Sequence, residues 1–347
     1  MASIRPIPQL VALLVALGGC TLATTTDPSK TSDPNGHAGA KVSDGPFRVT
    51  TFAGSTMGYE DGPAASAKFF WPSAIAFDAA GSALVTDRAN GHLRKITSDG
   101  QVTTLTPVTP AAFKNPDSLA IASSGDVYVA DTQNHVIKKV TNSGEVSVFA
   151  GTGVVGKADG AVDAATFQLP STLAVAPDGA VYVSDHSGKI RKIADGQVTT
   201  LEASFFSPQG IAYSNGRLYV CDNVEQIVSY VDLATGKKTE LAGTVYGRGY
   251  QDGTGKDARF DGPLGIAVDG AGTVFVGDAG NRRIRRVSAE GKVTTIAGTG
   301  ESGLVDEVAG LEAKFSDLRG MAIDASGNLY VCDNWNQRIR KLSPTAP

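Results

Sequence analysis

One unit of sequence recurs six times along this chain of 347 residues. Each copy holds four short apolar runs separated by Asp, Gly or Asn turn signals, which is typical of a four-stranded antiparallel meander. A proline opens the first run and an aspartate closes the second: Pro72 and Asp87, Pro116 and Asp131, Pro170 and Asp185, Pro208 and Asp222, Pro263 and Asp278, with Leu318 and Asp333 in the sixth copy. A repeat of roughly 40 to 50 residues made of four strands is typical of a β-propeller blade. We therefore predict an all-β, six-bladed propeller with four-stranded blades at about residues 72–105, 116–150, 170–201, 208–242, 263–297 and 318–343.

The sixth copy ends one strand short of the others. A run before the first copy, Arg48-Val-Thr-Thr-Phe-Ala-Gly54, matches the fourth strand of the fifth copy, Lys292-Val-Thr-Thr-Ile-Ala-Gly298. We predict that residues 48–53 complete the last blade, because this closure leaves no unpaired edge. The propeller would then occupy residues 47–347.

The details of the repeat resemble a known family. The chain carries the pattern AGTG, DG, A-x-F, P-x-G-I-A-x-D and G-x-x-Y-V-x-D-x-x-N-x-R-I-R-K, which resembles the NHL repeat from Phe47 to Leu342. Propellers of that family include RNA-binding regulators, adhesion and sensor ectodomains and a metal-dependent peptide-amidating lyase. The resemblance implies the fold and leaves the function open.

The first 46 residues read as an export signal and a tether. Residues 1–19 contain Arg5 and an apolar run from Leu10 to Leu17, too short to span a bilayer and typical of a signal peptide. Leu17-Gly-Gly-Cys20 resembles a bacterial lipobox, which implies a Cys20 carrying acyl chains such as palmitate; the alternative is an ordinary signal peptide with an incidental cysteine. Residues 20–46 are poor in large apolar side chains, and we expect a disordered tether. This predicts an exported lipoprotein of the cell envelope, anchored in the outer membrane on its periplasmic or surface side.

The charge and the remaining cysteines exclude some functions. A net charge of −4 offers no field for nucleic acid, and we expect no nucleic-acid partner and a monomeric chain. Cys221 and Cys332 precede the repeat aspartate in the fourth and sixth copies. Equivalent positions in non-adjacent blades lie too far apart for a disulfide, so we predict two buried free thiols.

The blade topology indicates where a ligand would bind. The loop from strand two to strand three and the connection between blades emerge on the same face, and the residue after each proline should line the mouth of the central channel there. These residues are Ser73, Asp117, Ser171, Gln209, Leu264 and, in the sixth copy, Arg319. Gluconolactonase and paraoxonase-type propellers, which are similar in fold, hold a divalent cation in the channel. Only Asp117 suits that chemistry here and Arg319 opposes it, so we expect no metal and no cofactor at the mouth.

Three histidines are the other candidate metal ligands. His92, His135 and His186 fall between strands two and three of successive blades, and three imidazoles are a ligand set for catalytic zinc. Their offsets from the repeat aspartate are five, four and one, which places them at different heights. The other interpretation is three solvated turn residues.

The recurring charged residues read as structural. An aspartate in every copy suits a backbone-capping turn, and the asparagine three residues later suits a left-handed turn position. The Arg or Lys pairs that follow, such as Arg94-Lys95 and Arg285-Arg286, are expected to pair with carboxylates or to lie over the blade edge. The two G-x-G-x-x-G matches, at Gly151 and Gly298, are blade connections and not dinucleotide sites.

Departures from the repeat mark a second candidate site on the same face. Trp335, Arg282, Arg283 and Arg338 fall in the loops of the fifth and sixth copies, and Tyr246 and Tyr250 in the connection between the fourth and fifth. Aromatic and arginine side chains anchor protein interfaces, although each could pack on its own loop. We expect a binding or scaffold module for a protein, peptide or polysaccharide. The alternative is a metal-dependent lyase or lactonase with a site at the channel mouth.

Overall fold

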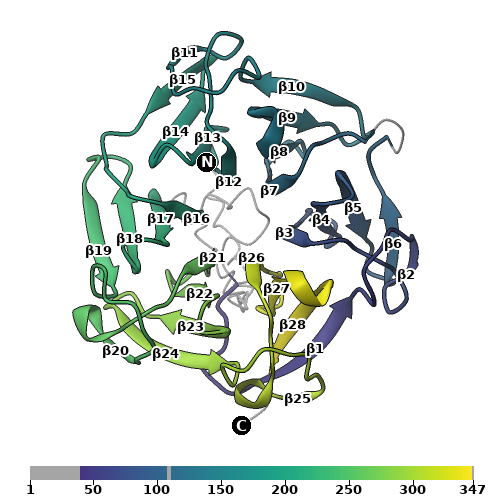
Figure 1. Ribbon diagram of the computed structural model, residues 1–347, viewed down its shortest axis with the longest axis vertical. Coiled ribbons are helices and arrows are strands. Elements are labelled where there is room, and N and C mark those ends of the chain that lie inside the picture. The colour runs from purple at the N-terminus through teal and green to yellow at the C-terminus, as the bar shows by residue number, and fades with distance from the viewer. Residues whose placement is uncertain (1–39, 108–110, 346–347) are drawn as a thin grey trace, which may run out of the picture. The chain divides into compact units, whose positions relative to one another are not determined.

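The chain folds into six small antiparallel sheets arranged in a ring, as seen in the computed structural model (Figure 1). The structure describes residues 40–107 and 111–345. The innermost strands of the six sheets surround the centre of the ring (Figure 1). The predicted six-bladed all-β propeller is confirmed. No helix within the described residues is long and apolar enough to cross a bilayer.

Each sheet is one blade, numbered here from the first repeat. Blade 1 contains β2 (Gly62–Pro63), β3 (Pro72–Phe77), β4 (Ala83–Asp87), β5 (His92–Ile96) and β6 (Gln101–Thr104). Blade 2 contains β7 (Pro116–Ile121), β8 (Val127–Asp131), β9 (Val136–Val140) and β10 (Val146–Ala150). Blade 3 contains β11 (Gly160–Ala161), β12 (Pro170–Val175), β13 (Val181–Asp185), β14 (Lys189–Ala194) and β15 (Gln197–Thr200).

The second half of the ring continues in the same way. Blade 4 contains β16 (Pro208–Ser214), β17 (Arg217–Asp222), β18 (Ile227–Asp232) and β19 (Lys238–Ala242). Blade 5 contains β20 (Gly253–Thr254), β21 (Pro263–Val268), β22 (Val274–Asp278), β23 (Arg283–Val287) and β24 (Lys292–Ala297). Blade 6 contains β1 (Phe47–Ala53), β25 (Val308–Ala309), β26 (Leu318–Ile323), β27 (Leu329–Asp333) and β28 (Arg338–Pro344). Four single-turn 3-10 helices lie in loops: η1 (Thr132–Asn134), η2 (Gly255–Asp257), η3 (Gly310–Glu312) and η4 (Asn334–Asn336).

Blades 1, 3, 5 and 6 have a fifth strand that the sequence did not predict. In each, two residues of the long connection entering the blade pair antiparallel with its outermost strand; Gly62, for example, pairs with Val102. Blades 2 and 4 have four strands. The long connection thus covers part of an edge that would otherwise be unpaired, which helps to protect the rim of the ring.

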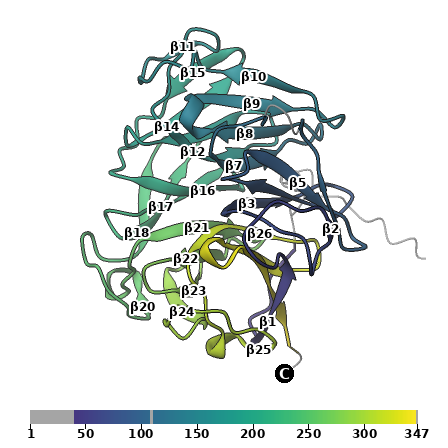
Figure 2. The same ribbon diagram turned by 45° about the vertical axis from the view of Figure 1, so that its right-hand side comes forward.

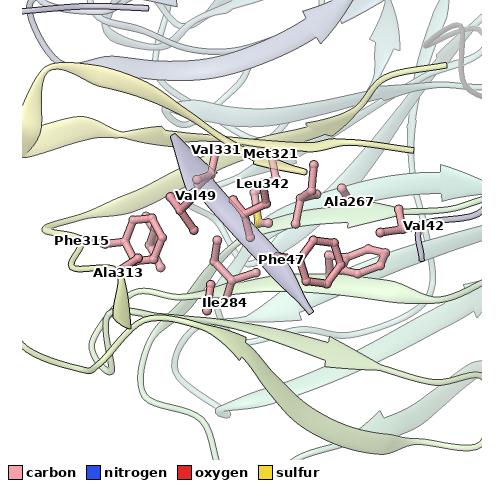
Figure 3. Close-up of a cluster of buried hydrophobic side chains, with 14 of the residues drawn as sticks. Val42, Phe47, Val49, Ala267, Ile284, Ala313, Phe315, Met321, Val331 and Leu342 are labelled. Carbon is pink, nitrogen blue, oxygen red and sulfur yellow. The ribbon is translucent and has the colours of Figure 1, made fainter. Parts of the chain in front are cut away.

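The N-terminal strand completes the last blade, as predicted. β1 pairs with β28 from Phe47↔Pro344 to Ala53↔Ile339 and with β25 on its other side. β1 and β25 lie together in both views of the ring (Figures 1 and 2). Phe47 and Val49 point into a cluster with Phe315, Val331 and Leu342 (Figure 3). The two ends of the propeller are therefore joined through main-chain bonds and a shared apolar core.

A buried ion pair forms the centre of four blades. In blade 1 the fully buried guanidinium of Arg94 donates to Asp87, to Asp61 in the connection and to the carbonyls of Glu60 and Lys68. Arg191, Arg285 and Arg340 occupy the same position in blades 3, 5 and 6. The first member of each predicted basic pair is thus not at the blade edge: it fixes the connection to strand two of its own blade.

Two details of the loops differ from expectation. The left-handed residue is not the asparagine but the residue after it, as at Gly91, His135, Arg282 and Gln337, because the asparagine side chain donates to the repeat aspartate instead.

The second detail is the glycine at position 265, which a steric contact requires. A Cβ built there would lie 2.1 Å from the carbonyl oxygen of Arg319, so glycine lets blades 5 and 6 approach closely.

Residues 40–46 were assigned to the tether, and the structure corrects this. Val42 is buried, and its amide donates to the Asp269 carboxylate in the β21–β22 turn. Gly270 N–H donates to Ala40 O, and Asp44 forms an ion pair with Arg286. The buried Val42 side chain, these two hydrogen bonds and the ion pair hold this segment against the ring. We call residues 40–46 the strap. Residues 1–39, with the predicted signal peptide and Cys20, lie outside the described residues.

Candidate functional site

The direction of the strands gives the ring two different faces. Strand one of each blade runs from the repeat proline, and strand two returns to the repeat aspartate, so the strand two to three loops and the inter-blade connections share one face. We call this the loop face. The turns between strands one and two and between strands three and four lie on the opposite face, together with the strap, which contacts the Asp269 turn.

The structure places the six predicted mouth residues around a central cavity of about 130 Å³. The residues are Ser73, Asp117, Ser171, Gln209, Leu264 and Arg319, one from each blade. Both serine hydroxyls already have protein partners: Ser73 Oγ lies 2.9 Å from Thr86 Oγ1 and donates to Pro116 O of blade 2, and Ser171 Oγ lies 3.0 Å from Ser184 Oγ. Asp117, Gln209 and Arg319 therefore supply the polar chemistry of this ring.

A second set of loop-face residues was not predicted as a group, and only His186 of it was a candidate from sequence. These are the residues that follow the repeat aspartates: Arg88, Thr132, His186, Asn223, Ala279 and Asn334. Arg88 Nε lies 2.5 Å from Asp117 Oδ1, which brings the two sets together across the boundary between blades 1 and 2. The available signal was variation: this position differs in almost every copy, next to an aspartate that never changes.

Asp117 is the acidic group of the channel mouth, and cations surround it. Burial raises the pKa of this carboxyl, whereas the nearby Arg88, Arg319 and His186 lower it. Arg319 in turn donates its Nε to Asp317 at 2.8 Å. The mouth thus combines two arginines with two carboxylates, and a metal cation placed there would face both guanidinium groups.

The three histidines do not form a metal site. His92 is not a solvated turn residue: it is buried at the start of β5 and its ring lies 5.2 Å from that of Tyr59. His135 accepts a hydrogen bond from Leu169 N–H, and His186 is exposed. Within the described chain, no three His, Cys, Asp or Glu side chains lie together as metal ligands. The residues present do not fit the zinc of the amidating lyase.

His135 instead links two blades. Its Nδ1 accepts from Leu169 N–H at 3.2 Å, and the same bond recurs from Gly262 N–H to Gln226 Oε1 and from Trp71 N–H to Gln337 Oε1, each at 2.7 Å. The contacts join blade 2 to 3, blade 4 to 5 and blade 6 to 1. A side-chain acceptor in a left-handed loop residue therefore fixes alternate blade boundaries.

We expect His135→Gln to keep the stability of the protein and His135→Leu to lower it by about 1 kcal/mol, the typical net value of one hydrogen bond. Glutamine supplies the acceptor that blades 4 and 6 already use, whereas leucine leaves Leu169 N–H without one. Urea unfolding of both variants measures the difference. Equal midpoints for the two variants would show that the bond contributes nothing.

The predicted aromatic and arginine sector is divided between two places. Trp335 is exposed in η4, and Arg338 donates to Asn336 O of that same loop. Arg283 stacks on Tyr250, with its Cζ 3.9 Å from the ring centroid, and Arg282 donates to Gly300 O. Tyr246 pairs with Phe206 of the blade 3 to 4 connection at 6.4 Å. Arg338 thus packs on its own loop, Arg282 and Arg283 pack on the connections before and after blade 5, and Trp335 and Tyr246 remain exposed.

Exposed apolar side chains gather on the loop-face segments. Two of the large hydrophobic residues exposed in the described chain, Val148 on β10 and Leu311 in η3, are exceptions. The others lie in strand two to three loops or in the connections between blades: Met57, Tyr59, Trp71, Val154, Val155, Phe206, Val224, Val245, Tyr246, Tyr250, Leu304 and Trp335. Exposed apolar groups concentrated on one face indicate an interaction surface.

The repeat aspartates and the two cysteines are structural. Asp87, Asp131, Asp278 and Asp333 each accept a hydrogen bond from a backbone N–H two residues before the innermost strand of their own blade, as Phe70 N–H does to Asp87 at 2.7 Å. Cys221 and Cys332 are buried free thiols, as predicted, and burial raises the pKa of both. Neither thiol is available as a nucleophile at neutral pH.

These features define a six-bladed β-propeller with polar groups at its channel mouth and exposed apolar side chains in its loops. Residues 315–342 match the NHL repeat model, and the chain is an NHL-repeat β-propeller. It is 31% identical over 176 residues to the chloroplastic protein SUPPRESSOR OF QUENCHING 1 of Arabidopsis thaliana, covering 48% of this chain and 16% of that one. It is 30% identical over 154 residues to human NHL repeat-containing protein 2, covering 41% and 21%. The matches thus span about a fifth or less of each relative.

Solved structures share the fold at lower identity. An auxiliary nutrient binding protein from Bacteroides ovatus superposes with a TM-score of 0.71 at 21% identity, covering 87% of this chain and 78% of that one. A gluconolactonase from Xanthomonas campestris superposes with a TM-score of 0.63 at 15% identity, covering 89% and 98%. These identities establish a common fold and no common function.

Proposed function

We propose that this propeller is a binding protein that recognises a protein, peptide or polysaccharide on its loop face. The observation that carries the proposal is the gathering of exposed apolar side chains on that face, with Trp335 and Tyr246 each 63% exposed. Aromatic residues supply large contact areas at low entropic cost, and they are enriched where ligands bind. The likeness in fold to auxiliary nutrient binding proteins agrees with this role.

We propose that the propeller lies in the cell envelope, and the position of the strap suggests a loop face turned away from the anchor. Residues 40–46 pack beneath blades 5 and 6, so Ala40, the first described residue, lies at the face opposite the loops. If Cys20 is acylated in the outer membrane, as its lipobox implies, the anchor and the binding surface lie on opposite faces. An anchored propeller of this kind would present its loops away from its own membrane.

Crosslinking in intact cells tests the proposed surface. A photoreactive phenylalanine analogue is placed at Trp335 or Tyr246, and at Val148 as a control, because Val148 is 58% exposed but lies on the outer strand β10. We expect an adduct from the two loop-face positions and none from Val148. Digestion with protease or glycosidase then identifies the class of partner. Equal adducts from all three positions, or none, would contradict the proposal.

The second candidate function is a metal-dependent lyase or lactonase with its site at the channel mouth. The likeness in fold to a gluconolactonase favours it, and the arginines beside Asp117 oppose it. Elemental analysis of protein purified without chelator distinguishes the two. One metal ion per chain that is lost in Asp117→Asn would favour the enzyme.

A further inference from the structure

The buried arginines of the blades and the two arginines at the channel mouth differ in their hydrogen bonding. The blade arginines use the whole guanidinium: in Arg285, Nε, Nη1 and Nη2 all donate, to Asp252, Asp278 and two carbonyls. Arg88 and Arg319 at the channel mouth differ. Each places only its Nε beside a carboxylate, Asp117 at 2.5 Å and Asp317 at 2.8 Å.

The remaining donors of the mouth arginines have no protein partner among residues 40–107 and 111–345. Both side chains are only partly exposed, at 26% for Arg88 and 33% for Arg319, so water reaches them from the channel side. Arg88 contacts Asp117, and Asp117 and Arg319 line the same central cavity, which places the three side chains in one region of the channel mouth. Two arginines with unused N–H donors therefore lie at the channel mouth, Arg319 in the cavity wall and Arg88 beside Asp117.

The geometry points to a binding site for a small organic acid at the channel mouth, with its carboxylate held by the Nη groups of Arg88 and Arg319. This inference deepens the proposed binding function and rests on it. A guanidinium edge fits a carboxylate with two parallel hydrogen bonds, which gives both affinity and orientation. Gln209 on the same rim has a free Oε1 for a ligand hydroxyl, since only its Nε2 is bonded, to Ser207.

Local charge favours a monocarboxylate over phosphate. Arg88 and Arg319 balance Asp117 and Asp317, so the site has no net charge before a ligand binds. A singly charged carboxylate adds one negative charge beside Asp117, whereas a phosphate dianion adds two. Because charges in a partly buried site are weakly screened, the doubly charged ligand meets more repulsion. The cavity of about 130 Å³ limits the part of the ligand that enters the channel to a small group.

Titration calorimetry with the intact chain tests the site. The probes are galacturonate, its neutral counterpart galactose, and inorganic phosphate. We expect saturable binding of galacturonate, with galactose and phosphate each at least about tenfold weaker, which is the value of a lost charge-assisted contact. Binding of galactose as tight as galacturonate, or of phosphate as tight as either, would overturn the assignment of a carboxylate. So would the absence of any binding.

Matched variants locate the bound anion. Arg319→Gln and the double variant Arg88→Gln with Asp117→Asn should each weaken galacturonate at least about tenfold; the double change leaves no unpaired buried charge, so folding is preserved. Arg217→Gln removes one positive charge, as Arg319→Gln does, but on β17 at the opposite face. It should alter the affinity less than about twofold. Equal effects of all three would place the anion elsewhere. Loop-face crosslinks with no anion binding would refute only this inference, and anion binding without crosslinks would refute only the macromolecular ligand.

Discussion

Deletion of Phe47–Gly54 is expected to abolish cooperative folding of the propeller at physiological temperature. β1 lies between β28 and β25 in blade 6 and pairs with both of them. It also buries Phe47, Val49 and Ala53 to 2% exposure or less. Loss of one buried phenylalanine alone costs about 3 to 5 kcal/mol, a large part of a total stability of about 5 to 15 kcal/mol. Thermal unfolding followed by circular dichroism measures the result.

A circular permutant separates the loss of the strand from the loss of its connection. Thr345 N–H donates to Pro46 O at 2.9 Å, so the end of β28 lies next to the start of β1. A permutant that carries Phe47–Gly54 after Thr345 through a short glycine linker should melt close to the intact chain. A deletion variant that melts like the intact protein would disprove closure by β1.

Arg285→Met is expected to lower the free energy of unfolding by about 3 to 5 kcal/mol, because it leaves a buried carboxylate without its partner. Burial already raises the pKa of Asp278 to about 6, although Asn281 and Arg285 lower it. Without Arg285 this carboxyl binds its proton more tightly in the folded than in the unfolded chain. The stability of the variant therefore falls as pH rises from about 4 through the folded pKa, and the loss relative to the native protein is smaller at pH 5 than at pH 8.

Arg286→Gln is the matched control. Arg286 follows on the same strand, and its ion pair is with Asp44, whose side chain is 56% exposed, so its loss should cost less than about 1 kcal/mol. Guanidinium unfolding at the two pH values compares both variants. If Arg285→Met loses no more than the control, the buried pair is not what holds the connection to blade 5.

The ring could be predicted from sequence because its information is repeated. The match of Val49-Thr-Thr to Val293-Thr-Thr was enough to assign β1 to blade 6, since both strands have the same neighbours. The fifth strands are different: Gly62 and Pro63 have no strand propensity, and they pair only because the connection returns along β6. The strap was missed for a related reason. Burial of Val42 depends on a turn more than 200 residues away.

The candidate site was predictable in position but not in chemistry. Blade topology placed Asp117 and Arg319 at the channel mouth, because every copy has the same geometry. Whether all the N–H donors of an arginine are hydrogen-bonded depends on the loop around it, however. The sequence alone does not distinguish Arg88 from Arg94 in this respect. Phe206 was missed because its partner, Tyr246, belongs to the next connection. Such a contact between loops of adjacent blades does not recur in every repeat, so the sequence pattern does not predict it.

The pairing of Val49 with Leu342 has a consequence for the order in which the protein folds. Of the strands of the propeller, β1 is the first to be made on the ribosome and its partner β28 is the last. Blades 1 to 5 contain only local hairpins, which form quickly, whereas ring closure joins the two most distant strands and must come last. Until then β1 is an unpaired, partly apolar edge. A chain interrupted before Arg338 keeps that edge permanently, so synthesis that stops early yields a species prone to aggregation rather than a smaller propeller.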